Sequence, residues 1–84
     1  MPSTYILRSK KDGRYYIGST DNLKNRLLQH NNGQSRYTKG RGPFIIVYRE
    51  DYQTRSEAKK REYYLKSLKS RTAIEKIVKS AAFV

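Results

Sequence analysis

Side chains of the types that act on phosphate groups are spread along the whole chain: 19 Lys and Arg, 7 Asp and Glu, 8 Tyr and one His. A guanidinium donates paired hydrogen bonds to phosphate oxygens, a lone carboxylate is a suitable ligand for Mg²⁺, and phenol and imidazole groups hold or move protons. Five of these residues stand in the short motifs described below and are the candidates for catalysis, and the last of them is also the candidate metal ligand: Tyr5, Tyr16, Arg26, His30 and Glu62.

Each candidate also has a purely structural interpretation. The two tyrosines could form a cross-strand packing pair, and the arginine could be one surface cation among many. The histidine could be favoured at the end of a helix by the helix dipole. The glutamate could form a salt bridge within its own helix with Lys59 or Lys66. Residue type alone does not decide between these interpretations, so spacing and context must.

The balance of charge narrows the class of partner. The 84 residues include 19 Lys and Arg against 7 Asp and Glu, a formal net charge of +12, which is more than solubility requires in so small a domain. Nucleic acid is the commonest polyanion to match such a charge. An anionic membrane surface competes poorly, because the basic residues are spread along the chain and not gathered on one amphipathic helix. We expect DNA as the partner, with RNA left open and no membrane.

Composition limits the kinds of site and of location. The absence of cysteine excludes disulfides and thiolate zinc sites, and the single histidine excludes sites built from several histidines. Any metal would need oxygen ligands. The chain is too short for two domains, so we expect one domain over residues 1–84. Because no stretch resembles a signal peptide or could cross a bilayer, we expect a soluble, cytoplasmic protein.

A β-hairpin followed by a helix is predicted at the start of the chain. Residues 4–8 and 15–20 are rich in aromatic and β-branched types and flank a glycine-containing turn. The helix is predicted over about Asn22–His30, with Asp21 as its N-cap and residues 31–33 ending it.

Three further elements are predicted after a polar loop over residues 34–43. The apolar run Phe44–Tyr48 predicts a strand covered on both faces. A helix opened by Thr54 or Ser56 would carry a narrow apolar stripe and be basic elsewhere, and Arg71–Ser80 predicts a last helix. The order β-β-α-β-α-α indicates an α+β fold in which a three-stranded antiparallel sheet is flanked by helices.

The register of the hairpin decides where the candidate tyrosines lie. If Arg8 pairs with Tyr15, then Tyr5 lies opposite Gly18 and both candidate tyrosines share one face of the sheet, because strand residues alternate between faces. We expect the missing side chain of Gly18 to leave room beside the Tyr5 phenol for a phosphate oxygen. On the following helix, the candidate arginine and histidine are one turn apart, so they project from the same side.

Short motifs follow one another at characteristic spacings. They are Ser3-Thr4-Tyr5; Tyr16-Ile17-Gly18; Arg26 and His30; Tyr37-Thr38 with Gly42-Pro43; and Glu57-Ala58-Lys59-Lys60-Arg61-Glu62. Each is weak by itself, but the ordered set is specific. Together they resemble the GIY-YIG nuclease family, in particular its small stand-alone bacterial members, over roughly Tyr5 to Lys66.

This resemblance implies a DNA endonuclease that uses one divalent ion, Mg²⁺ or Mn²⁺, and no organic cofactor. Glu62 would hold the metal, Arg26 would bind the phosphate, and Tyr5 would accept a proton from the attacking water. Tyr16 and His30 would position water or phosphate. Nucleic-acid contacts are expected in the hairpin turn, the basic loop and the glutamate's helix, from Lys11, Arg14, Arg36, Tyr37, Lys39, Arg41 and Lys66.

An alternative function stays open at this point. Many catalytically proven members of the family carry an asparagine on a helix beyond the glutamate, but residues 73–77 contain none, and the first motif lacks its glycine. The alternative is a non-catalytic nucleic-acid-binding module that keeps the same fold. In either case a monomer or a weak homodimer is expected.

Overall fold

A three-stranded antiparallel sheet lies between helices in the computed structural model, which describes residues 1–34 and 38–81. The strand order is β2-β1-β3, with β1 at Ser3–Ser9, β2 at Tyr15–Thr20 and β3 at Phe44–Asp51. The helices are α1 at Leu23–Asn31, α2 at Arg55–Ser67 and α3 at Arg71–Ala81. The predicted α+β fold and element order are confirmed. No helix in the described part of the chain is long and apolar enough to cross a membrane.

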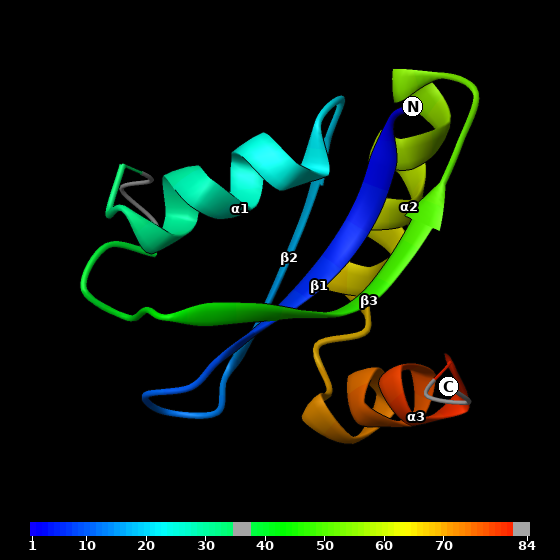
Figure 1. The fold of residues 1–84 in the computed structure, drawn as a ribbon. Helices are drawn as coiled ribbons and strands as arrows, with labels where there is room; N and C mark the ends of the chain where they lie inside the picture. The colour runs from blue at the N-terminus through cyan, green and yellow to red at the C-terminus, as the bar shows by residue number, and fades with distance from the viewer. Residues whose placement is uncertain (35–37, 82–84) are drawn as a thin grey trace.

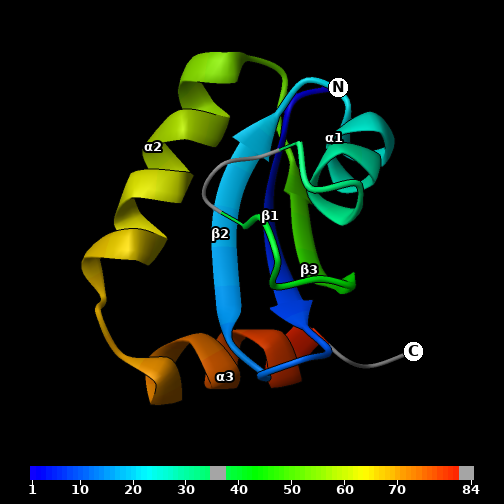
Figure 2. The same ribbon diagram turned by 90° about the vertical axis from the view of Figure 1, so that its left-hand side faces the viewer.

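The layers are arranged around the central strand β1. In Figures 1 and 2, α1 lies over one face of the sheet, and α2 and α3 lie over the other. Alternate residues of β1 serve the two sides, because Tyr5 and Leu7 pack with Leu23 of α1 whereas Ile6 packs with Leu65 of α2 and Ile74 of α3. The domain therefore has two small hydrophobic cores, one on each face of the sheet.

The hairpin between β1 and β2 has the predicted register. Its turn is closed by a 2.9 Å hydrogen bond from the Ser9 amide to the Arg14 carbonyl, and Gly13 supplies the left-handed residue with a φ of +74°. Tyr5 lies opposite Gly18, as the alternation of apolar residues predicts. Both candidate tyrosines consequently face α1.

A β-bulge in β3 explains how its apolar run serves both cores. Leu7 pairs with Ile46, but the preceding residue of β1, Ile6, pairs with Tyr48, so Val47 is an extra residue in the ladder. Ile46 therefore packs on the α1 side, while Val47 and Tyr48 both pack on the other side. The predicted cover on both faces is wrong at Ile45, which is 40% exposed because no helix lies over that end of the strand's second face.

The helix starts are set by side chains that accept backbone hydrogen bonds. The predicted cap of α1 was one residue too early, because Asn22 and not Asp21 accepts from the backbone of the first turn. Asp21 is instead 3.3 Å from Arg55 in an ion pair. α2 begins after Thr54 with a complete capping box in which Glu57 returns the hydrogen bond.

A buried hydroxyl ties α2 to the central strand. The Thr4 hydroxyl donates a 2.6 Å hydrogen bond to the carbonyl oxygen of Ala58, one turn before Glu62. Both Thr4 and Ala58 are almost completely buried, so neither the hydroxyl nor the carbonyl can form a hydrogen bond with water instead. The bond therefore sets where α2, and with it Glu62, lies relative to β1.

We predict that Thr4→Val lowers the free energy of unfolding by about 1–3 kcal/mol, because the buried Ala58 carbonyl loses its donor. Thr4→Ser, which keeps the hydroxyl, should recover most of the loss that is due to the hydrogen bond. Urea unfolding of the three proteins measures both effects. Equal stability of the valine variant and the wild type would contradict the role given to this bond.

Candidate active site

A cleft of about 650 Å³ opens at the edge of the sheet formed by β2. All five candidate catalytic residues lie on its wall: Tyr5, Tyr16, Arg26, His30 and Glu62. They come from β1, β2, α1 and α2, so residues far apart in the sequence are brought to one place. Their roles in catalysis stay a prediction.

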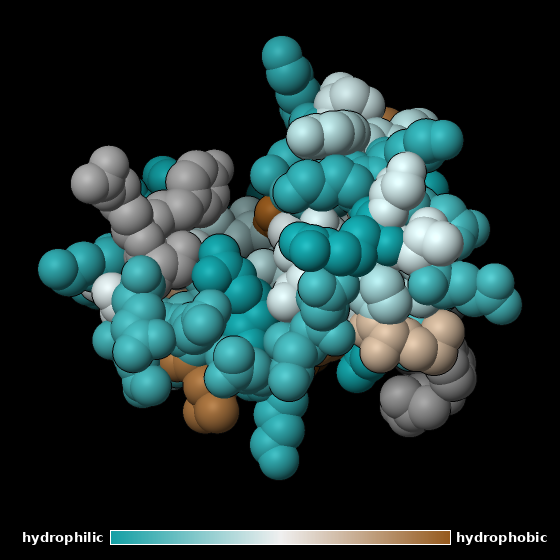
Figure 3. All heavy atoms as spheres, turned by 90° about the horizontal axis from the view of Figure 1, so that it is seen from above, coloured by the Kyte–Doolittle hydropathy of each residue, from teal (hydrophilic) through white to brown (hydrophobic). Residues whose placement is uncertain are grey.

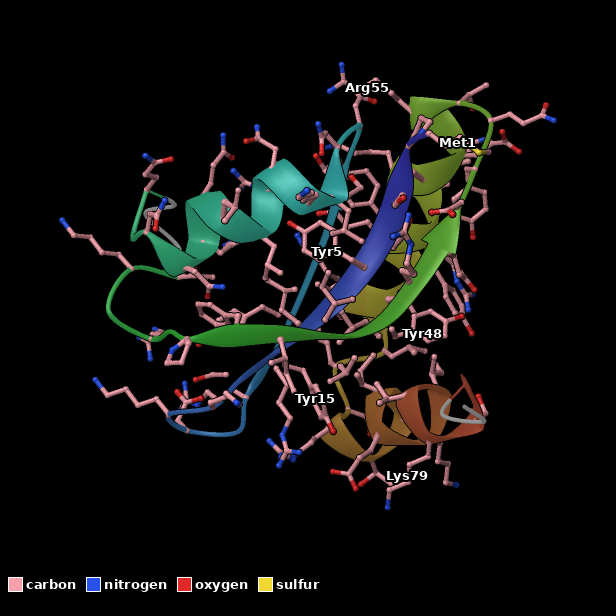
Figure 4. All side chains as sticks on the ribbon, viewed as in Figure 1. Met1, Tyr5, Tyr15, Tyr48, Arg55 and Lys79 are labelled. Atoms are coloured by element: carbon pink, nitrogen blue, oxygen red, sulfur yellow. The ribbon has the colours of Figure 1, made fainter. Side chains whose placement is uncertain are left out.

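The cleft crosses the edge of the sheet, so its wall has two halves. On β2, Tyr16 packs on the α1 side, whereas Tyr15 and Ile17 pack on the side of α2 and α3. Arg26 enters from the α1 side and Glu62 from the α2 side. Figure 4 shows the same division for two labelled tyrosines, with Tyr5 toward α1 and Tyr15 toward α3. A substrate in the cleft would contact both halves across β2.

The phenol of Tyr5 fills the space above Gly18. A Cβ atom on Gly18 would lie 2.6 Å from Cζ of Tyr5 and still closer to its hydroxyl oxygen. The prediction that this space would receive a phosphate oxygen is therefore wrong, because the tyrosine that was to border it occupies it. Tyr5 is only 3% exposed, but its hydroxyl end reaches over β2 to the cleft. The glycine is needed so that this end can cross the edge strand.

We predict that Gly18→Ala lowers the free energy of unfolding by about 1–3 kcal/mol, because the new methyl group collides with a buried ring that has no room to move. Gly42→Ala is the matched control, since a Cβ there would meet nothing closer than 3.6 Å. Thermal and urea unfolding of both variants tests the difference. An equally small effect at both positions would show that the Tyr5 ring adapts freely.

A chain of three side chains runs from the cleft into the α1 side of the domain. The Tyr5 hydroxyl is 3.1 Å from Nε2 of His30, and Nδ1 of His30 is 2.6 Å from the hydroxyl of Thr38. All three residues are buried. A neutral imidazole has one donor and one acceptor nitrogen, so each hydroxyl pairs with one of them.

Burial keeps both Tyr5 and His30 uncharged at neutral pH. It raises the pKa of the Tyr5 phenol, and the neighbouring Arg26 guanidinium offsets only part of that effect. Burial also lowers the pKa of the His30 imidazole, and the charge of Arg26 lowers it further. The pair is therefore a phenol beside a neutral imidazole, and a phenolate is not available without a place for its proton.

We predict that stability falls as the pH drops below about 6.5, because the unfolded chain then binds a proton that His30 does not bind in the folded state. A lowered folded-state pKa contributes stability above the unfolded value, and this stability is lost as the pH falls toward the folded value. The slope should be at most about 1.4 kcal/mol per pH unit. Urea unfolding across this range should show the slope in the wild type and not in His30→Gln, and parallel curves would contradict the assignment.

Glu62 is held by three neighbours at the other half of the cleft. The Ser19 hydroxyl donates to Oε1 at 2.6 Å, Lys66 Nζ donates to Oε2 at 2.7 Å, and Lys59 Nζ lies 3.9 Å from Oε1. Both lysines of the predicted structural alternative thus contact the carboxylate. Burial would raise the pKa of Glu62, but the hydrogen bonds from Lys66 and Ser19 outweigh it and hold the pKa below the usual value. Glu62 is therefore ionised although only 7% exposed.

The donor set around Glu62 fits one hard divalent ion. The carboxylate of Glu62 and the hydroxyl of Ser19 are oxygen donors at the cleft wall. Within residues 1–34 and 38–81, no group of three or more His, Cys, Asp or Glu side chains is placed to hold a metal. Mg²⁺ fits such a site, because it takes one or two protein carboxylates and completes its shell with water and phosphate. Binding through Oε2 would require Lys66 to leave.

Arg26 and Tyr16 have structural contacts as well as places on the cleft wall. Nη1 of Arg26 donates a 2.9 Å hydrogen bond to Gln29, one turn along α1. The Tyr16 ring packs edge-on against Phe44, with 5.3 Å between ring centroids and 86° between planes. Arg26 can exchange an uncharged partner for a phosphate at small cost, whereas the position of the Tyr16 ring is set by packing.

Comparison with known proteins identifies the family of this fold and site. A family model described as the GIY-YIG catalytic domain matches residues 1–76. The chain belongs to the GIY-YIG family. The predicted resemblance is thereby confirmed, and with it a domain of the nuclease class.

Relatives of this GIY-YIG domain share its size and fold. A UPF0213 protein of Clostridium perfringens is 48% identical over 69 residues, which are 81% of this chain and 73% of the relative. One from Staphylococcus saprophyticus is 47% identical over 64 residues, 75% of this chain and 77% of the relative. The solution NMR structure of a UPF0213 protein from Bacillus halodurans has a TM-score of 0.63 at 36% identity, covering 99% of this chain and 88% of that one. These names specify no reaction, so the reaction has to be argued from the site.

The predicted nucleic-acid contacts of the GIY-YIG domain fall into three groups. Lys66 lines the cleft. Arg36 and Tyr37 lie outside the described residues. The others are exposed and are not part of the cleft wall. Lys11 and Arg14 lie in the hairpin turn, and Lys39 and Arg41 lie in the loop between α1 and β3. If they contact nucleic acid, they do so away from the cleft.

Several cleft residues of the GIY-YIG domain were not among the predicted ones. Ser19 directly follows the second motif, and strand alternation places it on the α2 side, so its place in the cleft could have been predicted from the sequence. Thr38 belongs to the Tyr37-Thr38 motif, but its contact with His30 depends on the tertiary fold. Lys69 and Ser70, which connect α2 to α3, and Arg71, the first residue of α3, also line the cleft and add basic and hydroxyl side chains to its wall.

Proposed function

We propose that this GIY-YIG domain hydrolyses phosphodiester bonds in DNA with the help of one Mg²⁺ or Mn²⁺ ion, and selects DNA by structure and not by sequence. The observation that carries the proposal is an ionised, buried Glu62 on the wall of a cleft that also holds Arg26 and Tyr5. A metal ligand, a phosphate donor and a proton acceptor are the three groups that this reaction requires.

The charge of the cleft supports a phosphate substrate. Glu62 is the one acidic residue among the described residues of its wall, against five basic ones: Arg26, Lys59, Lys66, Lys69 and Arg71. The face of the molecule shown in Figure 3 is likewise covered mainly by hydrophilic side chains. An anion entering the cleft is therefore attracted from several sides at once.

Arg26 binds the phosphate in this proposal. When water attacks, negative charge grows on the non-bridging oxygens, and a guanidinium aimed at them stabilises the transition state more than the ground state. Arg26 is half-buried and interacts with Tyr5, so a phosphate bound by Arg26 would lie beside the phenol. Its present partner, Gln29, is neutral and is readily exchanged.

Tyr5 and His30 take the proton of the attacking water. As the water oxygen bonds to phosphorus, its proton moves to the Tyr5 oxygen, and the phenol's own proton moves to Nε2 of His30, 3.1 Å away. The bond from phosphorus to the 3′-oxygen breaks, and that oxygen takes a proton from solvent. This route avoids a free phenolate, which the raised pKa of Tyr5 disfavours. Tyr16 positions the water from the same face of the sheet.

Glu62 and Ser19 would hold the metal on the opposite half of the cleft. A bound divalent ion would supply positive charge that stabilises the leaving 3′-oxygen. Binding through Oε2 of Glu62 would displace Lys66 and leave the lysine to contact the substrate backbone. Lys66 thus neutralises the carboxylate in the resting protein and a phosphate in the complex.

We predict that Glu62→Gln and Arg26→Ala each slow cleavage by about 10²–10³-fold, the usual cost of losing one charge stabiliser of a transition state. Glu57→Gln is the matched control, because it removes the same charge from the same helix and glutamine still completes a capping box. Nicking of supercoiled, branched, nicked and single-stranded DNA should be measured in Mg²⁺, in Mn²⁺ and in EDTA, which should abolish it.

The second candidate function is a non-catalytic nucleic-acid-binding module. It is favoured by one observation, that both oxygens of Glu62 already have partners in Ser19 and Lys66. In that case the wild type would bind DNA in a salt-sensitive way without cutting it in either metal, and Glu62→Gln would bind as well or better. That pattern would exclude the nuclease. A nuclease with one site per monomer would have to dimerise or act twice to break both strands.

A further inference from the structure

A second hollow of about 240 Å³ adjoins the cleft. Ser19 and Lys59 line both, so the two spaces meet at the residues that contact Glu62. The remainder of the second hollow is formed by the start of α2 and the end of β2: Pro2, Thr20, Asp21, Arg55, Ser56 and Ala58. The groove therefore continues past Glu62 toward the beginning of α2.

We propose that this second hollow binds the nucleotide next to the reacting phosphate, with Arg55 contacting its phosphate group. This inference rests on the proposed function, and it adds the path that the nucleic-acid strand takes across the domain. The strand would run along α2, with the main cleft on one side of Glu62 and the second hollow on the other.

The spacing along α2 supports this path. Arg55, Lys59 and Lys66 are separated by four and seven residues, so they lie on one face of the helix, the face that also carries Glu62. At 1.5 Å per residue, Arg55 lies about 6 Å beyond Lys59 along the helix axis. This face of α2 is basic except at Glu62, where a metal ion instead of a lysine would contact the nucleic-acid strand.

The size and lining of the second hollow suit part of a nucleotide. Its volume is below the roughly 300 Å³ at which pockets for whole drug-sized ligands begin. Ser19, Thr20 and Ser56 line it. The Ser19 hydroxyl donates to Glu62 and the Thr20 hydroxyl pairs with the Asn22 backbone, but a hydroxyl oxygen has two lone pairs and can accept a further hydrogen bond from a sugar or a base edge. A strand whose phosphate lies in the adjoining cleft would bring such a group to this place.

The charged residues at the rim of the second hollow are available for exchange. Arg55 and Asp21 form an ion pair at 3.3 Å, but their side chains are 81% and 54% exposed. A pair this exposed contributes little to stability, so Arg55 can turn to a phosphate without a large loss. Asp21 would repel the same phosphate. The two residues should therefore affect DNA binding in opposite directions.

The test compares two exposed arginine and aspartate pairs that carry the same charge. Arg55→Ala removes the arginine at the second hollow, and Arg49→Ala removes one that pairs with Asp51 on β3, away from both hollows. Binding of a short fluorescent DNA strand is measured by anisotropy in EDTA, where no cleavage occurs, over a range of salt concentrations. Thermal unfolding checks that all variants are folded.

We expect Arg55→Ala to reduce the slope of log affinity against log salt by about 0.7–0.9, which corresponds to a roughly five- to eightfold loss of affinity at about 0.1 M salt. Arg49→Ala should change the affinity less than about twofold, and Asp21→Asn should raise it. Equal effects of the two arginine variants on a wild type that binds DNA would overturn the second hollow as a nucleotide site and leave the proposed function standing. A wild type that binds no DNA would overturn both.

Discussion

The packing of the Tyr5 phenol over Gly18 is the constraint on which the rest of the site depends. β2 separates the α1 side of the domain from the α2 side, and any side chain at position 18 would keep the phenol away from that strand's edge. With glycine there, the hydroxyl of Tyr5 reaches the cleft while its ring stays in the core beside Leu7 and Leu23. The hairpin register that places Tyr5 opposite Gly18 is thus required both by the packing of the core and by the shape of the cleft wall.

Charge organises the two halves of the cleft in different ways. On the α1 side, burial keeps Tyr5 and His30 neutral, and Arg26 adds to this effect at His30 but opposes it at Tyr5. On the α2 side, Ser19 and Lys66 keep Glu62 ionised, which suits a metal ligand. The same β2 strand divides the neutral Tyr5 and His30 from the ionised Glu62, so each half has its own electrostatic environment within one small domain.

The sequence predicts this fold well wherever the controlling contacts are local. Strand alternation and a glycine turn were sufficient for the register that pairs Tyr5 with Gly18, and the capping box at Thr54 marked the start of α2. The failures have non-local causes. The bulge at Val47 arises because one strand supplies side chains to both cores. The prediction for the space above Gly18 is wrong because the position of the Tyr5 ring is set by its packing with α1. The hydrogen bond from Thr4 to Ala58 of α2 joins residues 54 positions apart, so no local sequence pattern predicts it.

Thr4 and Tyr5 are consecutive residues of β1 that point to opposite faces, and each is tied to one half of the cleft. Thr4 anchors the helix that carries Glu62, and Tyr5 contacts the histidine of α1. The positions of both halves of the cleft are therefore set by contacts with the same strand, β1. The connecting loops can therefore gain or lose residues without altering the separation of the Tyr5 phenol and the Glu62 carboxylate.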